Sequence, residues 1–287
     1  MTRVILIVGC VGKSYCDVTY CNVYDFDKHT LDYKYDRTGF ENLSDEAFKG
    51  LPNRKINDGW FDRYMRDWCA VIDSGEYDAV TGWLQEDCLN YLLERGYDVE
   101  IILVDLSDCA SVYKKRSQGR GNNESYWQHL QDYCCKTLQQ YGSRSDIKVV
   151  IFDKPYYLSE YLLFSGTALK FSENLTCSYV DVVRDRMYDA FQTDGKVLRQ
   201  ALIPYYTQLV LTGMSLQTRF MEPITGTMVH NAWAVAYVTA YGFRYHQSSL
   251  DLFDKLPSKV QKSFQKSADV LNAVVKDLAH LQFLASI

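Results

Sequence analysis

The chain has 287 residues, of which 47% are hydrophobic and 23% are charged, with a formal net charge of −5. This length and composition suit one large or two modest globular domains. Residues 1–164 carry 19 Lys and Arg against 26 Asp and Glu, and residues 165–287 carry 12 against 10. Neither half has the charge of a basic nucleic-acid-binding surface, so we do not expect nucleic acid as a partner.

The nine cysteines include no C-x-x-C pair, so we do not expect a structural zinc site. The opening stretch MTRVILIVG has one basic residue and a short apolar run, which predicts a first strand and not a signal peptide. No segment approaches the ~20 apolar residues of a membrane span. Together with the expectation of reduced thiols, these features predict a cytoplasmic protein that does not bind membranes.

Strand-like and helix-like segments alternate through the first half of the chain. Apolar runs predict buried strands, and apolar residues recurring every three or four positions predict amphipathic helices. Strands separated by helices of this length imply an α/β fold with a parallel sheet and helices on both faces. The predicted strands are residues 4–8, 22–27, 77–81, 99–104 and 147–152, and the predicted helices are 60–72, 84–95 and 124–141.

After about residue 165 the strand-like runs disappear and helical spacing dominates. We predict a domain boundary near Phe164, a helical connecting segment at residues 165–220 and a second, all-α domain at residues 221–287. The predicted helices are residues 180–191, 197–211, 227–241 and 257–284.

A possible phosphate-binding loop follows the first predicted strand. Such loops have the pattern G-x-x-x-x-G-K-[ST], in which the lysine reaches the terminal phosphates and the hydroxyl binds magnesium. Gly12, Lys13 and Ser14 fit the end of this pattern, but the available first glycine is Gly9, which makes the loop two residues shorter. We therefore predict descent from a nucleotide-binding loop and leave its catalytic competence open. The alternative is a plain turn with a solvated lysine.

Two charged segments follow later strands. Asp25 and Asp27 close the second predicted strand, where a carboxylate can hold magnesium through water or accept a hydroxyl proton. A basic run follows the fourth strand, at the edge where open α/β sheets bind ligands, and its arginines could close over phosphates. The alternative for both is a solvated surface. The basic residues are Lys114, Lys115, Arg116 and Arg120.

These segments together resemble the P-loop nucleoside-monophosphate-kinase superfamily, especially the small nucleotide-kinase-like proteins of bacteriophages. The resemblance covers about residues 1–164, and the shortened loop is its clearest departure from the family. Its most specific part contains Tyr113, Arg116, Arg120, Gly121 and Asn122. The matching segments are GCVGKS, YDFD, WFDRYMRDW, YDAVT and YKKRSQGRGN.

The resemblance implies ATP and Mg²⁺ as cofactors, and the host cytoplasm as the location of a phage-encoded protein. It implies that Gly9, Gly12 and Lys13 hold the β- and γ-phosphates while Ser14 ligates Mg²⁺. Asp25 or Asp27 would activate the acceptor or support the metal. Arg116 and Arg120 would act as a lid.

The segment at about residues 221–283 resembles the RyR domain, a small helical module of ryanodine receptors that also occurs in bacterial and phage proteins. The resemblance rests on His230-x-x-Trp233, on the stretch YGFRY and on the long amphipathic helix that follows Leu256-Pro257. It implies a binding module for a ligand such as a nucleotide, with no chemistry of its own. The candidate ligand-binding residues are His230, Trp233, Arg244 and Tyr245. Of these, His230 and Trp233 are better explained as structural core residues, and Arg244 and Tyr245 are the better ligand candidates.

Three functions are consistent with these features. The first is an enzyme that transfers a phosphoryl group from ATP to a nucleotide or modified nucleoside. The second is a catalytically decayed kinase fold whose RyR-like domain binds, senses or sequesters a nucleotide, including a cyclic one. The third is a phage structural or interaction protein without a small ligand. The expected partner is a small-molecule nucleotide, and the sequence is compatible with a homo-oligomer.

Overall fold

The computed structural model describes residues 2–119, 121–171, 175–191, 196–216, 223–242 and 250–287. The chain forms two compact units, residues 1–176 and residues 177–287. Among the described helices, none is long and apolar enough to cross a membrane.

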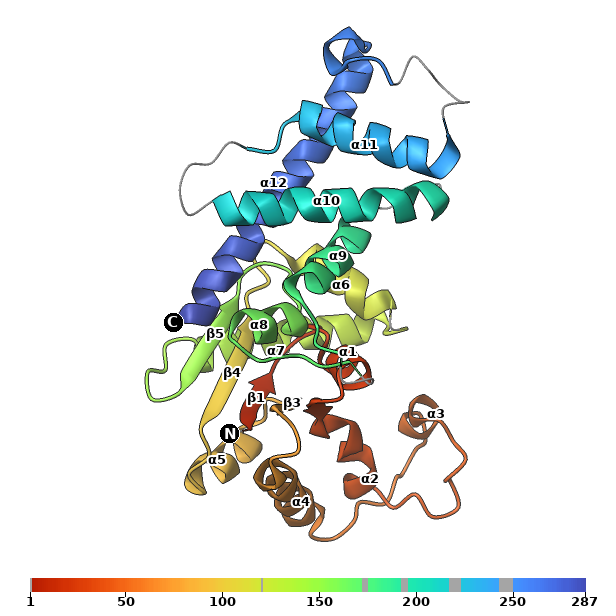
Figure 1. Ribbon diagram of the computed structural model, residues 1–287. Coiled ribbons are helices and arrows are strands. Elements are labelled where there is room, and N and C mark those ends of the chain that lie inside the picture. The colour runs from red at the N-terminus through yellow and green to blue at the C-terminus, as the bar shows by residue number, and fades with distance from the viewer. Residues whose placement is uncertain (1, 120, 172–174, 192–195, 217–222, 243–249) are drawn as a thin grey trace. The chain divides into compact units, whose positions relative to one another are not determined.

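The first unit is built on a parallel sheet of five strands in the order β2-β3-β1-β4-β5 (Figure 1). All six residues of β4 are buried, as expected for a strand covered on both faces. The predicted α/β fold with a parallel sheet flanked by helices is therefore confirmed. The strands are β1 (Arg3–Ile7), β2 (Val23–Asp25), β3 (Ala79–Trp83), β4 (Val99–Val104) and β5 (Lys148–Phe152).

Helices cover both faces of this sheet. Successive residues of β3 point to opposite faces. A methyl group on Gly82 would touch Trp68 of α4, whereas Trp83 stacks on Tyr133 of α7 at 5.6 Å. The helices of the first unit are α1 (Lys13–Thr19), α2 (Thr30–Lys34), α3 (Asp45–Lys49), α4 (Trp60–Ser74), α5 (Glu86–Glu94), α6 (Ala110–Gly119), α7 (Glu124–Tyr141) and α8 (Leu158–Phe164).

Strand β2 is shorter than the sequence predicts. It ends at Asp25, whose carboxylate accepts a hydrogen bond from the Asp27 amide at 3.2 Å. This contact turns the chain into a short 3₁₀ helix, Phe26–His29. Asp27 therefore lies just beyond the strand, in the turn that leads to α2.

The first unit also extends beyond Phe164. Asn22 donates a hydrogen bond to the Ala168 carbonyl at 2.7 Å and accepts one from the Lys170 amide at 2.9 Å. Both contacts involve an Asn22 side chain that is almost fully buried. The chain directly after α8 is thus attached to the sheet, whereas the sequence assigned it to a connecting segment.

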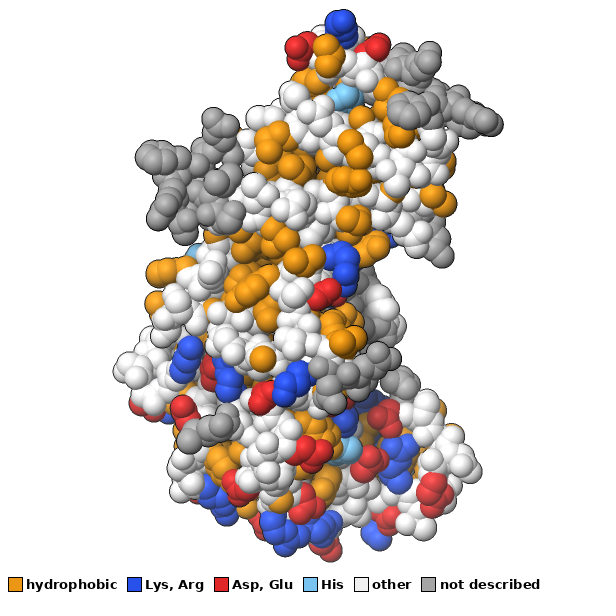
Figure 2. All heavy atoms as spheres, in the orientation of Figure 1, with side chains coloured by type: hydrophobic (Ala, Val, Ile, Leu, Met, Phe, Trp, Pro, Cys, Tyr) orange, Lys and Arg blue, Asp and Glu red, His pale blue; other side chains and the backbone are white. Residues whose placement is uncertain are grey.

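The described part of the second unit is helical. Helix α10 packs against the other three long helices, and it contains Pro204 within its length. The visible face of α10 and α11 is largely apolar, while charged side chains gather on the first unit (Figure 2). The helices are α9 (Tyr179–Ala190), α10 (Lys196–Leu216), α11 (Gly226–Tyr241) and α12 (Ser258–Ser286), with a 3₁₀ turn at Phe253–Lys255.

Candidate functional site

The order of the strands predicts a ligand-binding position at the carboxyl end of β1. The connection from β1 runs to β2 on one side of the sheet, whereas the connection from β4 runs to β5 on the other. Where neighbouring strands diverge in this way, open α/β sheets bind ligands outside the strands' carboxyl ends. The turn from residue 8 to residue 12, which links β1 to α1, lies at this point.

Two glycines shape this turn for separate reasons. Gly9 has φ 97° and Gly12 has φ 87°, in the left-handed region that favours glycine. A methyl group on Gly9 would also lie 2.9 Å from Val104 Cγ2, closer than carbon atoms can approach. Gly9 therefore lets the turn sit directly against the end of β4, and Gly12 lets α1 begin immediately after it.

Several amides of the turn have no partner. Those of Gly9, Val11 and Gly12 make no hydrogen bond to another described residue. Amides left unbonded near glycines with positive φ can form a concave site for an anion. This feature suits a phosphate, even though the turn is shorter than the usual phosphate-binding loop.

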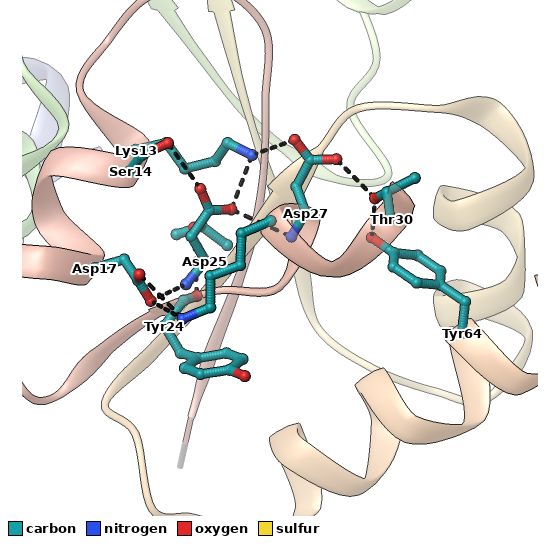
Figure 3. Close-up of polar contacts among 10 residues, drawn as sticks. Lys13, Ser14, Asp17, Tyr24, Asp25, Asp27, Thr30 and Tyr64 are labelled. Atoms are coloured by element: carbon teal, nitrogen blue, oxygen red, sulfur yellow. Dashed lines mark hydrogen bonds and ion pairs between the residues drawn. The ribbon is translucent and has the colours of Figure 1, made fainter. Parts of the chain in front are cut away.

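Lys13 lies at the start of α1 between two carboxylates (Figure 3). Its Nζ is 2.8 Å from Asp25 Oδ1 and 2.8 Å from Asp27 Oδ2. Only 10% of the Lys13 side chain and 2% of the Asp25 side chain are exposed. Ser14 adds a hydrogen bond from its hydroxyl to Asp25 Oδ2 at 3.2 Å. Lys13, which follows β1, thus meets two acids at the end of β2; Asp25 is nearly buried and Asp27 is 32% exposed.

Neighbouring residues hold the two carboxylates in place. Asp17 accepts a hydrogen bond from the Asp25 amide at 2.9 Å and pairs with Lys28 at 2.9 Å. Thr30 donates to Asp27 Oδ1 at 3.1 Å. These contacts fix the acids in position, independently of Lys13.

Burial and charge act in opposite directions on Asp25. Loss of hydration raises its pKa above the ordinary value of 3.8, and the nearby Lys13 ammonium partly opposes this rise. Lys13 is thus the principal group that lowers the pKa of Asp25 against the effect of burial.

The sequence predicted most of this cluster. The structure brings together Gly12, Lys13, Ser14, Asp25 and Asp27, with Gly9 at the other end of the same turn. Carboxylate and hydroxyl oxygens are the donors that Mg²⁺ prefers, so the donor chemistry fits this ion. Both carboxylates are engaged by Lys13, however, so a metal could use them only after the lysine moves. No group of three or more potential metal ligands occurs among the described residues.

Arg116 lies near the turn but in an unexpected setting. The basic run from Lys114 belongs to helix α6, whereas the sequence placed it between a strand and a helix. The Arg116 guanidinium donates to the carbonyls of Tyr156 at 3.0 Å and Pro155 at 2.6 Å. It is therefore anchored to the chain after β5. Arg120 lies outside the described residues.

Sequence reasoning missed two cations in the segment that follows the acidic pair along the chain. Lys34, at the end of α2, lies 5.4 Å from the centre of the Trp60 ring, and Arg54 lies 4.3 Å from that of Tyr35. Neither cation has an ion-pair partner within the described part of the chain. Both are half-buried. The sequence feature that could have identified them is the group of cations and aromatic residues between Tyr33 and Trp60.

In the second unit, His230 is 2% exposed and packs among aromatic rings. Its ring centre lies 5.0 Å from that of Phe264 and 6.3 Å from that of Trp233. Trp233 is half-buried and stacks on Tyr237 at 4.9 Å. His230 and Trp233 are therefore neighbours, with His230 in the core. Arg244 and Tyr245 lie outside the described residues.

The chain matches no protein-family model, no curated protein and no solved structure. The likenesses to nucleotide kinases and to the RyR domain therefore stay predictions from the sequence.

Proposed function

We propose that the first unit binds ATP at the turn between Gly9 and Ser14 and transfers its terminal phosphoryl group to a nucleotide or modified nucleoside. The observation that supports this most strongly is the position of Lys13. The nearly buried Lys13 directly follows the turn whose amides are unbonded, at the sheet edge where the strand order predicts a ligand site. The unbonded amides favour an anion at the turn, and Lys13 supplies a cation to it once the ammonium leaves the carboxylates.

In this proposal, ATP binding requires Lys13 to exchange partners. The ammonium leaves one or both carboxylates and pairs with the β- and γ-phosphates. Asp25 and Asp27 are then available to accept a proton from the acceptor or to hold water around Mg²⁺, and Ser14 can ligate the metal. Mg²⁺ would supply charge neutralisation at the phosphates. The acceptor oxygen forms a bond to the γ-phosphorus. The bond between the γ-phosphorus and the β,γ-bridging oxygen breaks, and ADP leaves.

The cations beyond Asp27 support an acidic acceptor. Lys34 and Arg54 are half-buried and have aromatic neighbours but no carboxylate partner among the described residues. An acceptor that carries a phosphate would supply the missing negative charge, and Tyr35 or Trp60 could pack against its base. A nucleoside monophosphate has both properties.

ADP formation from Mg·ATP tests this proposal across a panel of ribo- and deoxynucleoside monophosphates and modified nucleosides. We expect turnover with at least one acceptor. Arg54→Gln should raise the KM of a phosphorylated acceptor by about tenfold or more, the effect of losing one hydrogen bond to a charged group, and should leave the KM of ATP unchanged.

Arg66→Gln is the matched control, because Arg66 is exposed on α4 and should change neither KM. The absence of ADP formation with every acceptor would contradict the proposal. An equal rise in both KM values for Arg54→Gln would contradict the assignment of the acceptor side.

A second candidate is nucleotide capture by the second unit without transfer. The aromatic rings on α11 favour it, because Tyr237 stacks on Trp233 and makes a tilted ring contact with Tyr241, which is 41% exposed. An exposed ring can stack on a nucleobase, which contributes about 1–3 kcal/mol. This candidate requires binding that does not depend on Lys13.

Calorimetry with a library of linear and cyclic nucleotides separates the two candidates. If the second unit captures the ligand, Tyr241→Ala and Arg244→Ala should weaken binding at least about tenfold, whereas Lys13→Met should not. Tyr205→Ala is the control, because it removes a similarly exposed ring from α10. Binding that fails only in Lys13→Met would exclude capture by the second unit.

A further inference from the structure

The loop after β5 connects the basic helix α6 to the glycine turn. Leu158 donates a backbone hydrogen bond to the Val11 carbonyl at 2.8 Å, which joins the loop directly to the turn. A methyl group on Gly12 would lie 3.3 Å from Tyr157 Cδ1, so the Tyr157 ring packs on the Gly12 main chain. Tyr157 thus forms one wall of the turn.

Arg116 contacts Tyr157 and the two residues before it. Its guanidinium lies 3.7 Å from the centre of the Tyr157 ring, at stacking distance. The same guanidinium donates to the carbonyls of Pro155 and Tyr156, the two residues immediately before Tyr157. Tyr113, one turn earlier on α6, donates to the carbonyl of Lys154 at 3.3 Å. One helix therefore fixes both the main chain and the ring of this loop.

We propose that Arg116 and Tyr157 are positioning residues that hold the glycine turn in its anion-binding conformation. Arg116 then acts on a bound phosphate through Tyr157, and not as a lid that reaches the phosphate itself. The structural basis is a continuous series of contacts from Arg116 through Tyr157 to Gly12. Its consequence for nucleotide affinity rests on the proposed function, whereas its consequence for the turn does not.

Cys10 makes the conformation of the turn measurable without any ligand. It lies between the two glycines and is only 6% exposed, so its alkylation requires local opening of the turn. Cys88, on α5 of the same unit, is 4% exposed and reports opening elsewhere. Alkylation of each thiol by iodoacetamide can be followed by peptide mass spectrometry under reducing conditions.

Arg116→Gln and Tyr157→Leu should each accelerate alkylation of Cys10 by about tenfold or more, as expected when a charge-assisted contact that resists local opening is lost. The rate for Cys88 should not change. Tyr157→Phe, which keeps the ring, should accelerate alkylation of Cys10 less than Tyr157→Leu does. The double variant should be no faster than the faster single variant, because both residues act through one series of contacts. Lys114→Gln is the control on the same helix, since Lys114 pairs with Glu124.

An unchanged Cys10 rate in both single variants would overturn the inference. An equal acceleration of Cys10 and Cys88 would also overturn it, because the two residues would then support the whole unit and not the turn. If the wild type binds no nucleotide, the proposed function fails, and the Cys10 rates still decide this inference. If it binds ATP, the two variants should raise the KM of ATP by more than they lower kcat.

Discussion

Replacing Lys13 with methionine should abolish ATP-dependent phosphoryl transfer and lower the free energy of unfolding by about 3 kcal/mol near neutral pH. The first effect follows from the proposed contact between Lys13 and the phosphates. The second follows from its present contacts, because Asp25 and Asp27 would lose the cation that lies 2.8 Å from each. Removing one partner of a buried ion pair leaves an uncompensated charge.

The destabilisation should depend on pH in a defined direction. Burial raises the folded-state pKa of Asp25 above 3.8, and removal of Lys13 eliminates the main influence that lowers it. A carboxyl with a raised folded-state pKa contributes stability below its unfolded-state pKa and loses that contribution as the pH rises through the folded-state pKa. The difference in unfolding free energy between Lys13→Met and wild type should therefore shrink between pH 7 and pH values near 4.

Urea denaturation of both proteins at several pH values, together with an ATP turnover assay, measures these effects. Lys28→Met is the matched control, because Lys28 also pairs with an aspartate, Asp17, but is 40% exposed. It should cost less than about 1 kcal/mol at any pH. A destabilisation by Lys13→Met that is the same at pH 7 and pH 4.5 would contradict the electrostatic explanation. Undiminished ATP turnover would contradict the assigned role of Lys13.

Gly82→Ala should be among the most destabilising substitutions in the first unit, with a loss of at least about 3 kcal/mol. A methyl group on Gly82 would lie 2.1 and 2.4 Å from two ring atoms of Trp68. Trp68 is fully buried, and Phe26 stacks on it at 5.5 Å with nearly parallel rings. The ring therefore cannot move away without disturbing the packing between α4 and the sheet.

The midpoint and slope of urea unfolding test this prediction. Gly119→Ala is the control, because a methyl group there has no neighbour within 4 Å and should change stability little. In the Trp68→Leu background, Gly82→Ala should lower the free energy of unfolding by less than it does in the wild type, since the clash with the Trp68 ring disappears. A loss below 1 kcal/mol for Gly82→Ala would show that Trp68 can shift at little cost.

The regular elements were predictable where hydrophobic periodicity is strong. β4 and α7 have the predicted bounds, because six apolar-rich residues in succession suit only a buried strand there and α7 repeats apolar residues at helical spacing. Helix α6 was not predicted, since its polar sequence has no marked apolar face. Its buried side chains are Tyr113 and Ser117, and tertiary contacts stabilise it.

Some features of the candidate site were predictable from the sequence and others were not. Gly9, Gly12, Lys13 and the acids after β2 could be found from sequence, because strand ends and glycines are local features. The residue that each of these side chains contacts could not be found from sequence. Arg116 resembled a mobile lid residue in sequence, but it donates to main-chain carbonyls about 40 residues further along the chain.

The sequence by itself determined the α/β class of the first unit, the helical second unit and the place of the glycine turn, since these follow from periodicity and local backbone preference. Only the tertiary structure decided that Lys13 pairs with both Asp25 and Asp27 and that Tyr157 separates Arg116 from Gly12. The physical reason is that electrostatic and packing contacts depend on distances between residues remote in the chain. The order of strands and the register of the loops set those distances.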